Sequence, residues 1–442
     1  MPNLFPFQAD GADYLSSDPG FGCLQWDMGL GKSPTSITAA DKIGAKKILV
    51  LCPAVALFNW RREWDVWQEQ ERDIQVILSG KDRPNGDVVI CSYNLATNDV
   101  VHHALQQKYW DLIVLDEIQY LKTMKSKRTQ AVLGFGSYRG RGLTKDAPYV
   151  WGLSGTPAPN NISEIYPWLR SLAPDVLLLN GRTMTRSQFI GRYCKGHPTK
   201  YGFKITGNNE TNLGELRSRI DEVMDRCKKE DVLKNLPAMR FAQVEVDGGD
   251  LTQGVLDLEE EYKDQVEELI ERGGRIDEHT MKLRRITEMA KVGAAVEIIK
   301  ADLDDGMDKI LIFAIHRDVI DALQLALAEY GCSVVHGGVN AKNREKNIDA
   351  FHLGSARVFI GQIQAAGTAI TLHANGRCTD ALFLSADWVP ANNAQAAARI
   401  HRAGQTGSVL CRFLHLSGSI DEDINRIVLE KTRNLNEAFN GD

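Results

Sequence analysis

The stretch Met28-Gly29-Leu30-Gly31-Lys32-Ser33 follows a short apolar run and leads into residues 36–40, which have a helical composition. Glycine lets the backbone fold closely around an anion, and amide N–H groups at the start of a helix can then bind phosphate oxygens. We expect Lys32 to bind β- and γ-phosphates and the Ser33 hydroxyl to bind Mg²⁺. Because Trp26 stands where the strict pattern has glycine, a plain turn between a strand and a helix is the alternative.

An acidic pair that begins 84 residues after Lys32 supplies chemistry that a phosphate-binding loop alone lacks. Residues 111–115 read as a buried strand, and Asp116 and Glu117 follow directly. We expect Asp116 to hold Mg²⁺ through water, and Glu117 to polarise the water that attacks the γ-phosphate. Acidic pairs after apolar strands are common, but the two motifs together, in a chain that alternates strands and helices, predict a nucleotide hydrolase.

The composition is that of a globular protein of two or three domains, with 442 residues, 43% hydrophobic and 25% charged. Eight cysteines without a Cys-x-x-Cys pair argue against a zinc site and for a reducing compartment. The longest apolar run, residues 48–58, is interrupted by Pro53 and is too short to cross a bilayer. Since no signal-peptide pattern is visible, we expect no membrane contact and no secretion, but a place in a bacterial or phage-infected cytoplasm or, in a eukaryote, the nucleus.

Charge is distributed unevenly along the chain. The net charge is −6, yet residues 101–200 hold 14 Lys and Arg against 6 Asp and Glu. A local basic surface on an acidic protein fits a defined nucleic-acid track, and a solvated basic surface is an equal alternative. The candidate nucleic-acid contacts are basic residues that follow the acidic pair: Lys122, Lys125 and Arg128.

Strands alternate with helices twice along the chain, which predicts an α/β fold of two parallel-sheet lobes. The pattern is clear before residue 170, is replaced by basic and then acidic helical segments, and returns near residue 309. We expect a first lobe at residues 1–170, a basic and helical insertion with inter-lobe helices at 171–305, and a second lobe at 306–442.

Three features of the first lobe have both a functional and a structural interpretation. Gln8 could pair its amide with an adenine edge, or simply lie on the surface. Ser154 and Thr156 surround a glycine after a strand and could relay hydrogen bonds from the nucleotide site, or form an ordinary turn. A tryptophan stripe at helical spacing favours core packing. Its members are Trp60, Trp64 and Trp67.

Residues 395–405 read as a helix because of their alanine run. Arg399 and Arg402 are three residues apart and would share one face of it. A guanidinium suits bidentate phosphate contact, so two of them in a lobe without its own phosphate loop predict arginine fingers that reach a nucleotide across a cleft. For an isolated helix, structural ion pairing would be the simpler interpretation.

Together these motifs resemble superfamily-two helicases, and specifically the Swi/Snf-related ATPases, over nearly the whole chain. The motif at residues 395–405 is highly specific to that family. Tyr193-Cys194 and residues 212–216 look most like its fork-remodelling, strand-annealing branch. The stretches similar to family motifs are residues 6–8, 27–33, 116–117, 153–157, 226–237, 364–372 and 395–405.

The resemblance implies two RecA-like lobes with ATP and Mg²⁺ between them and DNA across both. ATP binding would close the cleft and hydrolysis would open it, so that repeated cycles move the protein along one strand of a duplex. Contacts to phosphates and sugars give little sequence preference, as a translocase requires. Residues at coupling positions are Gln119, Ser154, Thr156 and Gln395. Residues at the family's DNA-contact positions are Trp60, Ser92, Tyr93, His316, Arg317, Gly337, Gly338, Gly367 and Thr368.

We therefore predict a monomeric, ATP-dependent translocase on duplex or forked DNA that reanneals or regresses forks. Ser33 replaces the family threonine but keeps the hydroxyl, and Gln119 replaces histidine, which affects coupling efficiency more than activity. A strand-separating DNA or RNA helicase is the alternative enzyme, and a nucleic-acid-binding clamp with a vestigial ATPase is the alternative of another class. Because chromatin-reading and zinc modules are not recognisable, we expect a minimal motor of microbial or phage origin.

Overall fold

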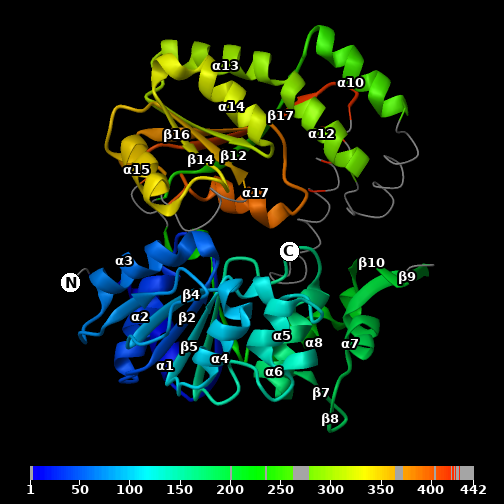
Figure 1. Cartoon of the computed structure of the whole chain (residues 1–442). Coiled ribbons are helices and arrows are strands. Elements are labelled where there is room, and N and C mark those ends of the chain that lie inside the picture. The colour runs from blue at the N-terminus through cyan, green and yellow to red at the C-terminus, as the bar shows by residue number, and fades with distance from the viewer. Residues whose placement is uncertain are drawn as a thin grey trace. The chain divides into compact units, whose positions relative to one another are not determined.

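The structure is a computed structural model that describes residues 3–199, 202–233, 236–261, 278–363, 372–402 and 405–419, with residues 421, 422, 424 and 428. The chain forms two compact units, and the boundary between them falls between residues 233 and 236 (Figure 1). Each unit is built on its own parallel sheet, so the predicted α/β fold of two parallel-sheet lobes is confirmed. The region expected between the lobes, residues 171–305, is divided at this boundary between the two units. Among the described residues, no helix has the length and hydropathy to span a bilayer.

The sheet of the first unit has seven parallel strands in the order β11-β1-β6-β5-β2-β4-β3. Its central strands are apolar up to their last residue because helices cover both faces of a parallel sheet, and β4 and β5 end in the polar Ser92 and Asp116. The strands are β1 (Gly20–Trp26), β2 (Ile48–Cys52), β3 (Ile74–Val76), β4 (Val88–Ser92), β5 (Leu112–Asp116), β6 (Tyr149–Ser154) and β11 (Met224–Cys227).

Most helices of the first unit lie between two strands of the sheet as crossover connections, whereas the first helix precedes β1 (Figure 1). The early ones are α1 (Pro6–Ser16), α2 (Lys32–Lys42), α3 (Leu57–Trp67), α4 (Asp99–Gln106), α5 (Lys127–Leu133) and α6 (Tyr166–Leu172). The later elements are the short strands β7 (Leu178–Leu179) and β8 (Arg182–Thr183), helix α7 (Arg186–Tyr193), the hairpin strands β9 (Cys194–Thr199) and β10 (Gly202–Asn208), α8 (Glu210–Ile220) and α9 (Lys229–Val232).

The tryptophan stripe lies on α3, as the helical spacing predicts. Trp60 and Trp64 are each 1% exposed, and Trp67 is half-buried at the end of the helix. Core packing is therefore confirmed for the first two. Trp64 also lies under the guanidinium of the buried Arg72, whose carbon is 5.6 Å from the ring centre.

The second unit has a six-stranded parallel sheet in the order β12-β17-β16-β13-β15-β14. Its strands are β12 (Met239–Val246), β13 (Lys309–Ala314), β14 (Cys332–Val335), β15 (Val358–Gln362), β16 (Cys378–Phe383) and β17 (Val409–Leu416). Its helices are α10 (Asp250–Glu261), α12 (Glu278–Ala290), α13 (Val292–Asp304), α14 (Arg317–Ala326), α15 (Ala341–His352) and α17 (Pro390–Ala397).

The acidic helical segment that precedes the second series of strands belongs to this unit. Ala295, Ile299 and Leu303 of α13 lie in one core with Ile310 and Ile312 of β13. The segment is thus part of the lobe that it precedes in sequence, and three of its charged residues, Arg284, Glu288 and Lys291, are buried in that lobe.

Candidate active site

The loop between β1 and α2 has the backbone conformation that its glycines predict. Gly29 and Gly31 have φ angles of 86° and 81°, in the left-handed region. A Cβ atom on Gly31 would also lie 2.2 Å from Nε2 of Gln8, so only glycine fits there. The first N–H groups of α2 have no acceptor within the helix, and the loop therefore presents donors to an anion.

Gln8 lies directly against this loop and is only 7% exposed. Its Nε2 donates to the Leu30 carbonyl at 2.9 Å, and its Oε1 accepts from the Phe5 amide at 2.9 Å. The surface alternative for Gln8 is therefore wrong. Recognition of adenine by this side chain stays a prediction.

Lys32 begins α2 and points back along the loop. Its Nζ donates to the Trp26 carbonyl at 2.8 Å and to the Asp27 carbonyl at 3.3 Å. The ammonium group is thus held over the loop. Ser33 follows it in the first turn of α2.

The acidic pair lies at the same edge of the sheet as the loop. Leu153 of β6 is in register with Leu24 of β1 on one side and with Asp116 of β5 on the other. Two strand spacings of about 4.8 Å place Asp116 roughly 10 Å from the backbone that leads into the loop. The register therefore brings together the residues that the sequence assigns to phosphate, metal and water.

Asp116 is held in place inside the unit. Trp60 Nε1 donates to its Oδ2 at 2.8 Å, and the Tyr93 hydroxyl donates to its carbonyl at 2.9 Å. Burial, followed by the nearby Glu117 carboxylate, raises the pKa of Asp116 from 3.8 to about 7. The positive charge of Lys32 lowers the pKa of Asp116 but does not offset the effect of burial.

Glu117 has an unusual backbone conformation, with φ 52° and ψ 58°. A non-glycine residue there stores about 1 kcal/mol of strain, and such strain is concentrated at functional sites. Its Oε2 accepts from Gln119 Nε2 at 2.6 Å, Gln119 Oε1 accepts from the Ser154 hydroxyl at 2.7 Å, and Ser154 Oγ accepts from the Thr156 amide at 3.0 Å. A continuous hydrogen-bonded chain thus connects Glu117 with the turn after β6.

The turn after β6 also contacts the phosphate loop. A Cβ atom on Gly155 would lie 2.9 Å from Cγ of Met28, so glycine permits close packing of the loop against the turn. The loop, the acidic pair and the Ser154-to-Thr156 turn therefore form one continuous structure.

Trp26 stands where the strict loop pattern has glycine, and its side chain packs into the first unit. Its ring occupies the position of a side chain on Gly11, where a Cβ would lie 2.2 Å from Cζ2. Its Nε1 donates to Asp225 of β11 at 2.7 Å, and Asp27 Oδ2 accepts from the Lys229 amide at 2.8 Å. These ties to β11 and α9 were missed from the sequence, because β11 has no apolar pattern.

Three of the residues predicted to contact DNA face inward. Trp60 and Tyr93 are each 1% exposed, and both bind Asp116. Ser92 is 3% exposed, and its hydroxyl accepts from the Leu95 amide at 3.2 Å. All three side chains are buried in this structure, and their contact with DNA stays a prediction.

The basic residues after the acidic pair differ in exposure. Lys125 is exposed, whereas Lys122 is partly buried and pairs with Glu164 at 3.2 Å. Arg128 lies over the Tyr120 ring, 5.1 Å from its centre. Lys125 is thus the freest of the three for contact with an anionic partner.

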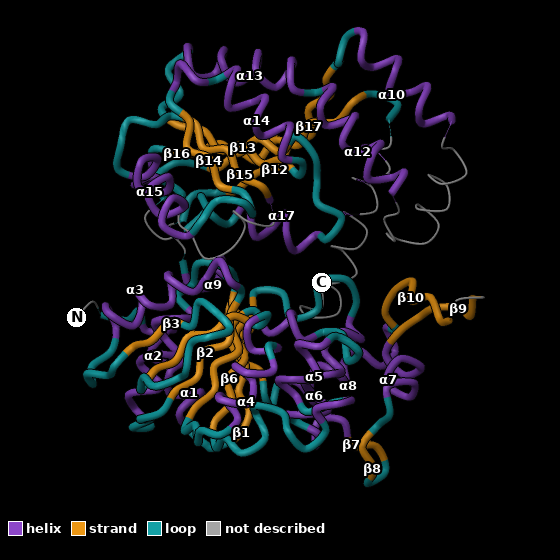
Figure 2. The backbone as a smooth tube through the Cα atoms, viewed as in Figure 1, coloured by secondary structure: helices purple, strands orange, loops and turns teal. Residues whose placement is uncertain are grey.

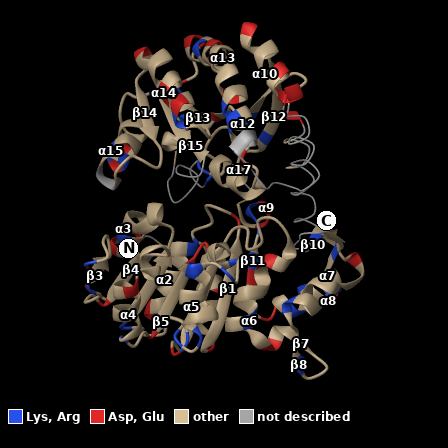
Figure 3. Cartoon of the chain, turned by 45° about the vertical axis from the view of Figure 1, so that its right-hand side comes forward, with Lys and Arg blue, Asp and Glu red and all other residues tan. Residues whose placement is uncertain are grey.

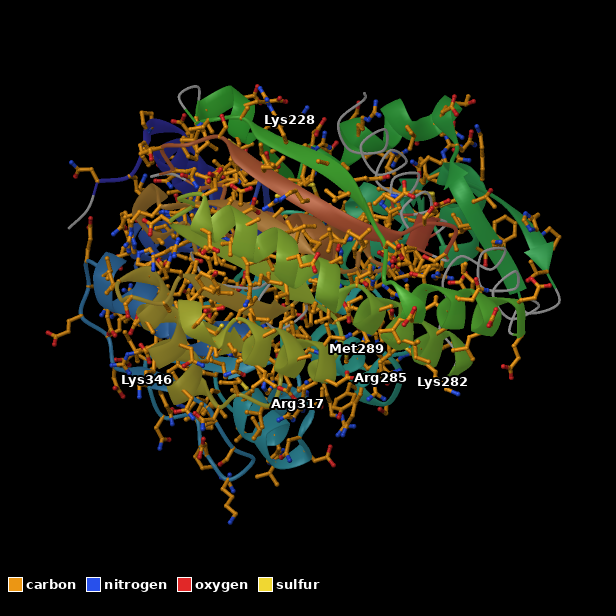
Figure 4. The ribbon with its side chains drawn as sticks, turned by 90° about the horizontal axis from the view of Figure 1, so that it is seen from above. Lys228, Lys282, Arg285, Met289, Arg317 and Lys346 are labelled. Carbon is orange, nitrogen blue, oxygen red and sulfur yellow. The ribbon has the colours of Figure 1, made fainter. Side chains whose placement is uncertain are left out.

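The second unit places its predicted DNA contacts at the carboxyl edge of its sheet. His316 Nδ1 bonds Glu288 Oε2 at 2.7 Å, and Arg317 beside it is exposed. Arg285 of α12 pairs with Asp318 at 2.8 Å, next to Arg317 in sequence (Figure 4). The Arg285 guanidinium of α12 therefore lies close to the carboxyl edge of the second sheet.

A glutamine bridges two strands at the same edge. Gln362 Nε2 donates to the Ile315 carbonyl at 3.1 Å, and its Oε1 accepts from the Gly337 amide at 3.1 Å. Gly337 and Gly338 are exposed. Their nucleic-acid role stays a prediction, and Gly367 and Thr368 lie outside the described residues.

The helix predicted to carry the two arginines ends earlier than expected. α17 ends at Ala397, so Arg399 and Arg402 lie in the following turn and do not share a helical face. Arg399 N bonds the Ala396 carbonyl at 3.1 Å, an i to i−3 bond that ends the regular helix. Arg399 is 3% exposed, and its Nε donates to the Gln395 carbonyl at 2.9 Å.

Arg402 is less enclosed than Arg399. It is half-buried, and its Nε donates to the Ala398 carbonyl at 3.1 Å. Gln395 of α17, which the sequence assigns to the coupling of ATP hydrolysis to movement on DNA, is 6% exposed. Of the two arginines, Arg402 is therefore the better placed to reach a ligand.

Replacing Asp116 by asparagine is expected to stabilise the protein without nucleotide and metal at pH 8 more than at pH 5. A carboxyl with a raised folded-state pKa binds its proton more tightly when folded, so ionisation destabilises the fold as pH rises from 3.8 to about 7. The neutral amide avoids that loss. Thermal unfolding from pH 5 to 8 in a chelating buffer measures it, with exposed Asp18→Asn as the control. Parallel curves for wild type and Asp116→Asn would contradict the assignment.

The geometry defines a class before any relative is considered: a two-unit α/β protein whose first unit carries a phosphate loop, an acidic pair and a hydrogen-bonded relay at one sheet edge. Comparison with known families agrees. The SNF2-related domain matches residues 14–250, and the helicase conserved C-terminal domain matches residues 290–404. The chain belongs to the SNF2-related family.

Curated relatives match almost the whole chain. It is 27% identical over 454 residues to the SWI/SNF-related matrix-associated actin-dependent regulator of chromatin subfamily A-like protein 1 of Xenopus tropicalis, covering 99% of the chain and 45% of that protein. The homolog of this protein in Caenorhabditis elegans is 29% identical over 98% of the chain and 61% of its own length. Mouse DNA annealing helicase and endonuclease ZRANB3 is 25% identical over 99% of the chain and 41% of its own length. The chain thus spans about half the length of these relatives.

Among solved structures, a Sulfolobus solfataricus SWI2/SNF2 ATPase core in complex with dsDNA is similar, with a TM-score of 0.46 and 23% identity. The match covers 99% of this chain and 93% of that one.

Proposed function

We propose that the protein is an ATP-dependent DNA translocase that acts on duplex or forked DNA as a monomer. The observation that carries this proposal is the hydrogen-bonded chain from Glu117 through Gln119 and Ser154 to Thr156, which begins beside the phosphate loop. An ATPase needs the loop and the acidic pair. The relay adds a physical route by which the state of the nucleotide can affect the rest of the unit.

The residues at this edge fit ATP and Mg²⁺. The loop offers N–H donors and the Lys32 ammonium to phosphates, and Gly31 leaves room for a close approach. Ser33 and Asp116 would hold Mg²⁺, since a hydroxyl and a buried carboxylate are the oxygen ligands that it prefers. A dication beside Asp116 would also offset the repulsion from Glu117 that raises its pKa. When bound, Mg²⁺ would neutralise charge on the phosphate oxygens.

In this arrangement Glu117 orients the attacking water and accepts its proton, and Gln119 holds the Glu117 carboxylate in position. Arg402 of the second unit would stabilise charge on the phosphates during transfer. Hydrolysis then requires residues of both units, and it is this requirement that would couple ATP turnover to their relative movement.

DNA as the partner is supported by the family and by the charge pattern. One relative is named a DNA annealing helicase, and residues 101–200 carry a surplus of basic residues over acidic ones. The exposed Lys125, Arg317 and Gly337-Gly338 are the described side chains and backbone groups best placed for sequence-independent phosphate contact.

Gln119→Ala is expected to lower the DNA-stimulated ATPase rate about tenfold, because a hydrogen bond to a charged group is worth about 1.5 kcal/mol. Binding of ATP should be unchanged, since Gln119 contacts Glu117 and Ser154 and not the loop. Steady-state ATP turnover and nucleotide titration measure the two effects. Exposed Gln107→Ala on the same unit is the matched control. A normal rate for Gln119→Ala would exclude the relay from catalysis.

ATPase rates with blunt duplex, forked duplex, single-stranded DNA and RNA test the proposal. We expect strong stimulation by duplex and fork, and little by RNA. Preference for single strands or RNA, with displacement of a paired strand, would favour a strand-separating helicase instead. Tight DNA binding without ATP turnover would leave a vestigial ATPase, and no response to any nucleic acid would overturn the proposal.

A further inference from the structure

The β9–β10 hairpin of the first unit is not used by the nucleotide site. It pairs with no strand of the seven-stranded sheet, and its two strands extend away from α7 and α8 (Figure 2). A two-stranded hairpin by itself is only marginally stable in water. Its base must therefore be fixed by other contacts, and its exposed strands are available to a ligand.

The base of the hairpin is firmly anchored. Arg192 Nε donates to Glu215 Oε2 at 3.0 Å, and the hydroxyl of the fully buried Tyr193 donates to Glu215 Oε1 at 3.1 Å. Asn209 and Asn212 each donate a side-chain amide to the Arg192 carbonyl, at 2.9 and 3.0 Å. The Arg192 guanidinium lowers the pKa of Glu215, so the carboxylate stays charged. Tyr193, Asn212 and Glu215 of this anchor belong to the two sequence stretches that resemble the fork-remodelling branch.

The strands beyond the anchor carry an exposed aromatic ring. Phe203 is 51% exposed, and a Cβ on Gly196 would lie 2.6 Å from its Cε1. The glycine on the opposite strand thus lets one edge of the ring rest on the hairpin backbone while half of its surface stays open. Lys204 is in register with His197, and both point to the other face of the hairpin from Phe203.

Basic residues outnumber acidic ones in this part of the chain, although Arg192 pairs with Glu215 and Lys195 pairs with Glu210 of α8. Residues 182–208 contain six Lys and Arg and no Asp or Glu. Figure 3 shows basic positions on α7, α8 and at β10. An exposed aromatic ring among basic residues is the composition of surfaces that bind single-stranded nucleic acid by base stacking and phosphate contact. The charge complements DNA and would repel a basic protein partner.

We propose that the β9–β10 hairpin binds the unpaired strand of a DNA fork, with one base stacked on Phe203 and the basic charge of residues 182–208 attracting the phosphates of that strand. This inference rests on the proposed function. It adds that the protein distinguishes a DNA fork from an unbranched duplex. The first unit would then bind the sugar-phosphate backbone of the duplex. It would recognise the fork through an unpaired base, which a blunt duplex does not expose.

The test compares Phe203→Ala with wild type on two DNA substrates, a fork with unpaired arms and a blunt duplex of the same length. The fork concentration needed for half-maximal ATPase stimulation should rise about tenfold for Phe203→Ala, which corresponds to about 1.4 kcal/mol and lies within the range for stacking of one base. The value for the blunt duplex should not change. A 2-aminopurine base placed first in the unpaired arm should be quenched by wild type and much less by the variant.

Two further variants make the result specific. Phe203→Tyr keeps an aromatic face and should retain fork binding and quenching. Tyr109→Ala removes another exposed aromatic from the same unit, between α4 and β5, and should behave as wild type on both substrates.

The outcomes separate the hairpin proposal from the function on which it rests. If no DNA stimulates hydrolysis by wild type, the proposed function fails. If duplex and fork both stimulate and Phe203→Ala matches wild type on the fork, or weakens both substrates equally, the hairpin does not read the branch. In the former case the exposed ring serves another partner, such as a protein.

Discussion

Glu117→Gln is expected to lower ATP hydrolysis by about 10³-fold while leaving ATP binding intact. The amide keeps the shape of the side chain and its contact with Gln119, but cannot accept a proton from the attacking water. The left-handed backbone conformation of residue 117 places its side chain at the end of β5. Because glutamine has nearly the same shape as glutamate, the substitution removes the proton acceptor without moving the chain. Single-turnover hydrolysis and nucleotide titration measure the two effects separately.

Glu71→Gln provides the matched control, because this exposed glutamate of the first unit lies away from the sheet edge that carries the loop. It should hydrolyse ATP at the wild-type rate. A near-normal rate for Glu117→Gln would show that Glu117 does not accept the proton of the attacking water. Asp116 would then be the remaining carboxylate of the site to test in that role.

Arg402→Ala is expected to lower turnover on the order of 10³-fold, the lower end of the effect of an arginine finger. DNA affinity and ATP binding should stay close to wild type, since Arg402 is assigned to charge that develops during phosphate transfer. The reason to choose it over Arg399 is structural: Arg399 is 3% exposed, while Arg402 is half-buried. DNA-stimulated ATPase rates and DNA titration measure the separation.

Loss of packing could also lower activity, and Arg377→Ala controls for it. Arg377 lies in the same unit and, like Arg402, donates its Nε to a backbone carbonyl, that of Ala374 at 3.1 Å. Equal losses for Arg377→Ala and Arg402→Ala would mean that Arg402 acts by stabilising the unit. A loss for Arg402→Ala alone supports its catalytic role.

The sequence predicted the phosphate loop, the acidic pair and the central strands because each depends on local composition. Glycines before a helix, carboxylates after an apolar run, and continuous Val, Ile and Leu can all be read directly from the sequence. Gln119 and Ser154 were both assigned to coupling from the sequence, and the structure joins them by a bond in which Gln119 Oε1 accepts from the Ser154 hydroxyl. The two-unit fold followed from the repeated alternation of strands and helices.

What the sequence did not show depends on contacts between distant residues. β11 has the polar sequence Met-Asp-Arg-Cys and becomes a strand because it pairs with β1 and because Asp225 accepts from Trp26. The alanine run predicted a helix through residue 405, but bonds of the i to i−3 type end it at Ala397. Trp60 was assigned both to the core and to DNA, and only the structure shows that its indole is used to hold Asp116.

We propose that ATP turnover at the edge formed by Lys32, Asp116 and Glu117 moves the protein along duplex DNA. Displacement of a third strand from a DNA triplex tests it most directly, because movement along the duplex removes the third strand without separating the other two. We predict ATP-dependent displacement by wild type and none by Lys32→Ala. Wild-type protein that hydrolyses ATP on this DNA but leaves the third strand in place would contradict the account.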